Sequence, residues 1–150
     1  MTIEQDIKQD KFRNEFQKSA INLIFTYNWM TERMKLVFDQ FDITPQQFNI
    51  LRILRGAGVP LSTLQIRQRM LDKMSDTSRI VDRLIIKGLS KKNTCKSDRR
   101  LVDVVITEKG KKLLEKIDAR DEQMDAIFKN ISVAEARLLN QLLDKIRSAE

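Results

Sequence analysis

The placing of helix-breaking residues is the feature that most constrains how this chain folds. Neither glycine nor proline occurs before Pro45, so we expect a long helix in the residues that precede it. Apolar residues there recur at alternating spacings of four and three, which is a heptad seam. The seam consists of Phe16, Ala20, Leu23, Tyr27, Met30, Met34, Val37 and Phe41. It predicts packing against the same domain or against a second subunit.

Capping patterns mark where three later helices begin. A Ser or Thr followed three residues later by Gln or Glu can form a capping box, in which both side chains bind free backbone N–H groups. The pattern starts at Thr44, Ser62 and Ser132. It predicts helices over about residues 45–55, 63–70 and 133–148. Thr107 is the expected cap of a further helix that runs to about residue 130.

A short amphipathic helix is expected over residues 75–87, where Gly88 ends it. Its polar side carries Ser75, Ser78, Arg79, Asp82, Arg83 and Ile86. Beyond Gly88 we expect a short extended stretch, a polar tip at 96–100 and a second strand over 101–106, where Val and Ile favour a strand. Together with the helix at 63–70, this order of elements is a helix-turn-helix followed by a two-stranded β-wing. The predicted fold class is mainly α (α+β).

The basic charge of the chain is concentrated in this region. Between residues 67 and 100, eleven Lys and Arg face four Asp, a net charge of +7, and the whole chain is also +7. The charges outside this window therefore cancel. A basic patch confined to one part of the surface indicates a phosphate-binding face, although a solvated surface would also carry such charges.

Several classes of function are disfavoured by composition. The chain has no histidine and a single cysteine, Cys95, so common zinc-ligand sets, an internal disulfide and histidine-based catalysis are excluded. It also lacks a Gly-rich phosphate loop and an evident nucleophile–base pair. We expect no catalytic residues, no metal and no cofactor. No apolar run approaches a membrane span and the first ten residues are too polar for a secretory signal, so we expect a cytoplasmic protein.

Three stretches, 43–51, 78–89 and 97–110, resemble the MarR family of winged helix-turn-helix transcriptional regulators. They occur in the family's order and at close to its spacing, and the resemblance covers nearly the whole chain. It implies a winged helix-turn-helix DNA-binding domain over residues 42–110. It also implies a helical dimerisation region that combines residues 1–41 with residues 111–150.

The resemblance assigns roles to individual residues. Asp98 and Arg100 match the wing-tip Asp-x-Arg of the family, in which the arginine enters the minor groove and the aspartate orients it. The implied DNA-binding residues are Ser75, Ser78, Arg79 and Arg83 on the recognition helix, with Lys92, Lys96, Asp98, Arg99 and Arg100 on the hairpin. Asp76 and Asp82 are unusual near DNA. They tune specificity or pair with neighbouring arginines, and we favour the pairing.

The resemblance further implies how such a protein works. Family members are mostly homodimeric repressors that bind a palindromic operator in duplex DNA and are released by small, often phenolic, ligands. Phe25, Trp29 and Phe48 are candidates for lining an effector site, although core packing explains them equally well. Some relatives sense oxidants through a cysteine near the N-terminal helix. The chain departs from them, since Cys95 lies on the hairpin, where we expect an inert thiol.

An alternative function is a winged-helix module that mediates protein–protein or RNA contacts and has no operator. RNA recognition usually requires aromatic stacking platforms on an exposed sheet, and the hairpin from Leu89 to Ile106 contains no aromatic residue. Duplex DNA is therefore the favoured partner. The operator sequence, the regulated genes and the identity of an effector do not follow from the sequence.

Overall fold

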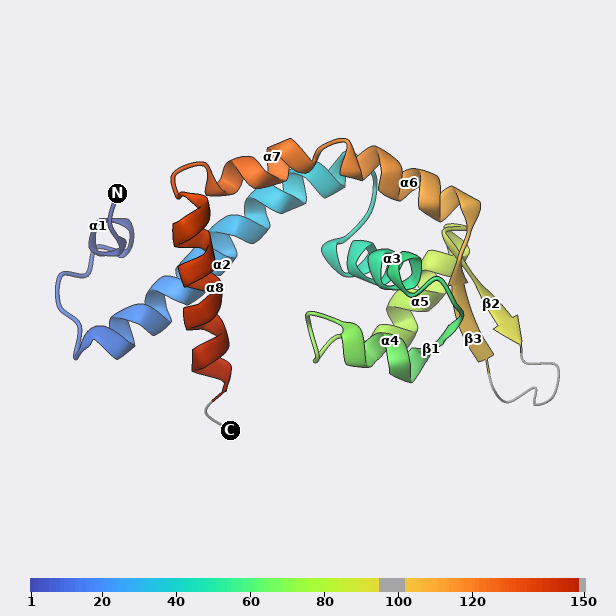
Figure 1. The fold of residues 1–150 in the computed structure, drawn as a ribbon, viewed down its shortest axis with the longest axis horizontal. Coiled ribbons are helices and arrows are strands. Elements are labelled where there is room, and N and C mark those ends of the chain that lie inside the picture. The colour runs from blue at the N-terminus through green and yellow to red at the C-terminus, as the bar shows by residue number, and fades with distance from the viewer. Residues whose placement is uncertain (95–101, 149–150) are drawn as a thin grey trace. The chain divides into compact units, whose positions relative to one another are not determined.

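The computed structural model of the chain describes residues 1–94 and 102–148 and divides into two compact units, Met1–Asp118 and Ala119–Glu150 (Figure 1). The first unit contains helices α1 (Ile3–Ile7), α2 (Glu15–Asp39), α3 (Pro45–Ala57), α4 (Thr63–Arg69), α5 (Thr77–Ile86) and α6 (Glu108–Asp118). Its strands are β1 (Leu61–Ser62), β2 (Ser90–Thr94) and β3 (Val102–Ile106). The second unit contains α7 (Asp121–Asp125), a 3₁₀ turn (Ala126–Phe128) and α8 (Val133–Arg147).

The predicted capping boxes are present where the sequence places them. The side chains of Thr44, Ser62 and Ser132 accept hydrogen bonds from the backbone N–H three residues later, and the Gln or Glu at that position binds back to each cap. Pro45 occupies the start of α3, where its missing N–H costs nothing. Thr107 accepts from the N–H of Gly110 at 3.1 Å and so caps α6, as predicted.

The long N-terminal helix is shorter than the absence of breakers predicts. Lys8 has a left-handed backbone (φ 53°) that ends α1, and the side chain of Asn14 accepts from the N–H of Gln17 to begin α2. Polar capping residues therefore interrupt the helix without any glycine or proline. The helix predicted over 107–130 is also wrong in its extent, because α6 ends at Asp118 and α7 begins after Arg120.

The wing belongs to a three-stranded antiparallel sheet in the order β1-β3-β2. The two predicted strands, β2 and β3, pair through Ser90 with Ile106 and Thr94 with Val102. The short strand β1 was not predicted, and it pairs Leu61 with Val104. Strand β1 directly precedes α4, so the sheet fixes the start of the helix-turn-helix.

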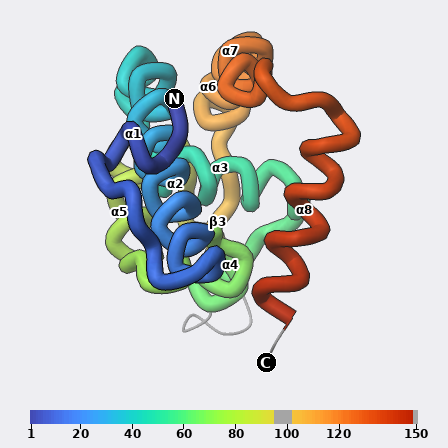
Figure 2. The backbone as a smooth tube through the Cα atoms, turned by 90° about the vertical axis from the view of Figure 1, so that its left-hand side faces the viewer, coloured from blue at the N-terminus to red at the C-terminus, as the bar shows by residue number. Residues whose placement is uncertain are grey.

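Helix α3 is the centre of the first unit. Both views place it between α6 and the pair formed by α4 and α5 (Figure 1, Figure 2). Its residues Ile50 and Leu51 are fully buried, as are Leu84 of α5 and Leu114 of α6. This apolar core positions α5 with one face turned to solvent.

Much of the predicted heptad seam is exposed in the single chain. Val37 is buried, whereas Phe16 (85%) and Tyr27 (62%) are largely exposed. In the second unit, α8 exposes Leu138, Leu139, Leu142 and Ile146. Among the described residues, no helix is both long and apolar enough to cross a membrane.

Candidate DNA interface

Helix α5 carries the predicted DNA-binding side chains on its exposed face. Val81 and Leu84 are buried against the core, while Ser78, Arg79 and Arg83 are exposed. The 3.6-residue period of the sequence predicts both faces. The exposed hydroxyl and guanidinium groups are donors suited to phosphate oxygens and to the acceptor atoms of guanine.

Ser75 lies outside α5, which corrects its predicted place on the exposed helix face. The helix begins at Thr77 with Asp76 as its N-cap, and Ser75 forms part of the preceding turn. The hydroxyl of Ser75 donates to the carbonyl oxygen of Asp72 at 2.8 Å. The turn between α4 and α5 therefore holds this hydroxyl before α5 starts.

The two aspartates of this region have partners other than the predicted arginine side chains. The carboxylate of Asp76 accepts from the backbone N–H of Arg79 at 3.2 Å and so caps the helix. Asp82 lies on the exposed face, and its Oδ1 is 3.6 Å from Nζ of Lys92 in β2. The two charged side chains are 62% and 56% exposed. This ion pair connects α5 to strand β2 of the wing.

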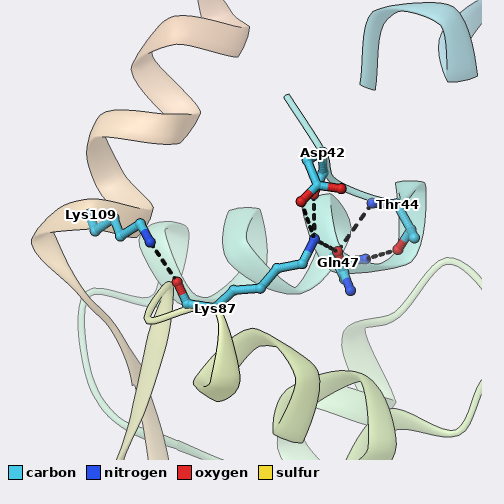
Figure 3. Close-up of polar contacts among 5 residues, drawn as sticks. All are labelled: Asp42, Thr44, Gln47, Lys87 and Lys109. Atoms are coloured by element: carbon cyan, nitrogen blue, oxygen red, sulfur yellow. Dashed lines mark hydrogen bonds and ion pairs between the residues drawn. The ribbon is translucent and has the colours of Figure 1, made fainter. Parts of the chain in front are cut away.

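A polar cluster holds the C-terminal end of α5 (Figure 3). The ammonium of Lys87 donates to the backbone carbonyl of Asp42 and, at 3.4 Å, to Oε1 of Gln47. The Asp42 carboxylate is 3.5 Å from the same nitrogen. Lys109 donates to the carbonyl of Lys87 at 2.8 Å. The end of α5 is therefore bound both to the turn between α2 and α3 and to the start of α6.

The junction between α5 and the wing is closely packed. The hydroxyl of Thr107 donates to the carbonyl of Gly88 at 2.7 Å, and the N–H of Leu89 donates to the carbonyl of Leu84 at 2.9 Å. Gly88 has a left-handed backbone (φ 71°), as predicted for the residue that ends the helix. These bonds fix the direction in which β2 leaves α5.

The remaining predicted wing residues, Lys96, Asp98, Arg99 and Arg100, lie outside the described residues, as does Cys95. Lys92 is described and lies on β2, where it faces solvent. The DNA-binding roles of these residues stay predictions.

A cavity of about 550 Å³ opens beside the Lys87 cluster. It is lined by Phe41, Asp42, Lys87, Leu89, Lys109, Lys112, Leu113 and Lys116. The lining therefore combines four lysines and one aspartate with three apolar side chains. The sequence does not predict this site, because its residues come from three separated segments. The spacing of Lys109, Lys112 and Lys116 along one side of α6 was the available signal.

Known transcriptional regulators are similar in sequence to this chain. No family model matches the chain. The multiple antibiotic resistance protein MarR of Salmonella typhimurium is 28% identical over 127 residues, which cover 83% of this chain and 88% of that protein. The HTH-type transcriptional repressor IacR of Pseudomonas putida is 26% identical over 145 residues, covering 91% and 84%. The chain is similar in sequence to MarR and to other HTH-type transcriptional regulators.

Solved structures of MarR-like proteins have the same fold. The regulator BpsR of Bordetella bronchiseptica, whose DNA binding is regulated by 6-hydroxynicotinic acid, matches with a TM-score of 0.80 and 22% identity, covering 94% of this chain and 100% of that chain. A mutant MarR from E. coli complexed with operator DNA matches with a TM-score of 0.78 and 21% identity, covering 91% and 99%. At these identities the likeness is one of fold.

The predicted ligand-binding residues lie on α2 and α3 of this MarR-like fold. Phe48 packs against the fully buried Phe38, with ring centroids 4.7 Å apart. The guanidinium of Arg33 lies 3.8 Å from the centroid of the Trp29 ring, and Phe25 is partly exposed. The cavity beside Lys87 is lined by other residues, so the assignment of Phe25, Trp29 and Phe48 to an effector site stays a prediction.

Proposed function

We propose that the chain is a sequence-specific transcriptional repressor that binds a palindromic operator in double-stranded DNA. The exposed face of α5 carries the proposal, because Ser78, Arg79 and Arg83 extend from a helix whose opposite face is fixed in the core. Helices held in this way fit the major groove of B-DNA, where arginine binds guanine through two hydrogen bonds. A related fold complexed with operator DNA and a relative named as a repressor support the proposal. The protein would act in the cytoplasm and have no enzymatic role.

We further propose that the repressor is a homodimer formed through its helical ends. The exposed part of the α2 seam, including Phe16 and Tyr27, and the exposed leucines of α8 leave apolar surface that a second copy would cover. A two-fold dimer would present two copies of α5 to successive major grooves, about 34 to 36 Å apart. An inverted repeat is the DNA sequence that matches this symmetry.

We propose that a small effector releases the repressor from DNA. The cavity beside Lys87 has a volume of about 550 Å³, which lies within the range of small-ligand sites. Its apolar side chains and its four lysines favour an aromatic anion. Contact with Lys87 would connect such a ligand to the end of α5. The regulation of BpsR DNA binding by 6-hydroxynicotinic acid supports ligand control of DNA binding within this fold.

Binding-site selection from a random duplex library tests the proposed function. We expect the wild-type protein to select an inverted repeat. Arg79→Ala should weaken binding to the selected sequence more than to random duplex, since a base contact is lost together with a charge. Arg13→Ala, the same substitution before α2, should leave the preference unchanged. A library without a recurring sequence after selection would instead support an interaction module that has no operator.

A further inference from the structure

We propose that Asp82 reads a cytosine in the major groove, an inference that rests on the proposed binding of operator DNA. Asp82 lies on the exposed face of α5, one residue before Arg83 and three after Arg79. At this place the carboxylate would face the DNA together with the two arginines. A negative charge there opposes binding to phosphate and must be explained by another contact.

DNA would displace the partner that Asp82 has in the free protein. Nζ of Lys92 lies 3.6 Å from Oδ1 of Asp82, and both side chains are more than half exposed. Exposed ion pairs of this kind contribute little free energy because water and salt screen them. Lys92 is also cationic, and a DNA phosphate offers it a stronger charged partner. The Asp82 carboxylate would then turn to a base edge.

The chemistry of a carboxylate selects one base. Ionised Asp82 is an acceptor only, and it needs a donor. Guanine presents N7 and O6 as acceptors, thymine presents O4, and adenine places its N7 acceptor beside its N6 donor. Cytosine alone offers the N4 amino donor without an adjacent acceptor. Asp82 therefore favours cytosine and repels guanine at the position that it faces.

Asparagine at position 82 gives the sharpest test, because it has nearly the shape of aspartate but carries both a donor and an acceptor. It matches the N6 and N7 atoms of adenine. Selection with wild-type protein should yield cytosine at one symmetric position of each half-site. Selection with Asp82→Asn should replace this cytosine by adenine. The preference for cytosine over adenine at that position should change by about tenfold.

Two matched controls separate base reading from loss of charge. Asp76→Asn removes the same charge from the same helix, but asparagine is an equally good N-cap, so the selected sequence should not change. Lys92→Gln removes the partner of Asp82. It should weaken binding to selected and random duplexes by similar factors, and the selected cytosine should be retained. Thermal unfolding of each variant verifies that α5 remains folded.

The outcomes distinguish this inference from the proposed function. A wild-type protein that selects no sequence overturns both. A wild-type protein that selects an inverted repeat, together with an Asp82→Asn variant that selects the same repeat, overturns the cytosine contact alone. The cytosine contact is also overturned if Asp82→Asn and Asp76→Asn tighten binding to all duplexes equally, because only net charge would then be acting.

Discussion

Lys87 and Asp42 join the C-terminal end of α5 to the turn that follows α2. The Lys87 ammonium donates to the backbone carbonyl of Asp42, and the carboxylate of the same residue is 3.5 Å away. Asp42 has a left-handed backbone (φ 50°), and its carbonyl oxygen accepts from this nitrogen. Oε1 of the buried Gln47 accepts from the same nitrogen. One lysine therefore connects the proposed recognition helix to the helix that carries the seam.

Removing this ammonium should destabilise the first unit. Lys87→Met retains most of the apolar stem but leaves the Asp42 carbonyl and the buried Gln47 amide without a charged donor. We expect the free energy of unfolding in urea to fall by about 1 to 3 kcal/mol. Asp42→Asn should have little effect, because the carboxylate is 99% exposed and asparagine also tolerates a positive φ. An equal loss in both variants would show that the carboxylate, not the carbonyl, holds Lys87.

Gly110 should not accept a methyl group. A Cβ at this position would lie 2.3 Å from the carbonyl oxygen of Leu89 and 2.7 Å from Cγ1 of Ile106. The backbone oxygen cannot rotate away, so α6 or the start of the wing would have to move. We expect Gly110→Ala to lower the free energy of unfolding by about 1 to 3 kcal/mol.

Gly56 provides the matched control for this substitution. It lies within α3, and a Cβ there meets no atom within 4 Å. Gly56→Ala should therefore raise the free energy of unfolding by about 0.5 to 1 kcal/mol, since alanine loses less backbone entropy in a helix. Urea unfolding of both variants checks the pair. Similar values for the two would contradict the close contact at Gly110.

The parts of this fold that depend on neighbouring residues could be predicted from the sequence. The capping boxes at Thr44 and Ser62 and the two faces of α5 follow from local spacing, and the structure confirms them. Features that depend on distant segments were missed. Strand β1 is two residues long and exists only because Leu61 pairs with Val104.

The candidate site shows the same division. The exposure of Arg79 and Arg83 follows from helical periodicity. The contact between Lys87 and Asp42 spans 45 residues and depends on a left-handed turn, for which the sequence has no strong signal. The charge of Asp76 predicts pairing with an arginine side chain, whereas the structure uses its carboxylate as the N-cap of α5, a position that aspartate favours.

The exposed seam of α2 should form the dimer interface. Tyr27→Glu introduces a charge at a seam position that is 62% exposed in the single chain, and burial of that charge in a dimer would be costly. We expect sedimentation equilibrium to show a monomer at concentrations where the wild type is a dimer. Leu36→Glu is the control, because Leu36 is 67% exposed but lies outside the seam. Dimers that persist in the Tyr27 variant would assign dimerisation to another surface.

Acid should loosen α1. The pKa of Glu4 is lowered from 4.5 to about 2, chiefly by the hydrogen bond from Lys18 of α2. A carboxyl with a depressed pKa stabilises the fold above its unfolded pKa, and this contribution is lost as the pH falls through the folded value. NMR shifts of the α1 amides should therefore be constant above pH 5 and change progressively between about pH 4.5 and 2. Glu4→Gln should remove the part of this change that comes from Glu4 and leave the amides insensitive to the Lys18 contact.

The family resemblance assigns Arg100, at the wing tip, to the minor groove. Arg100→Ala should weaken binding to the selected operator by about 1 to 3 kcal/mol and reduce the magnitude of the log-affinity versus log-salt slope by about one. Arg99→Ala removes the same charge at the neighbouring position and measures the effect of charge alone. A larger loss at Arg100 than at Arg99 is expected, because only Arg100 belongs to the Asp-x-Arg pair.

Asp98→Ala tests that pair by the sign of its effect. If Asp98 holds the arginine in the groove, its loss should weaken operator binding although the protein becomes more positive. If the wing acted only through its net charge, the same substitution would tighten binding to operator and random duplex alike. Affinity measured at several salt concentrations separates these outcomes, since a charge effect fades as salt rises and a lost positioning contact does not. Tighter binding to both duplexes would therefore remove the assigned role of Asp98 and leave Arg100 as one phosphate-binding charge among several.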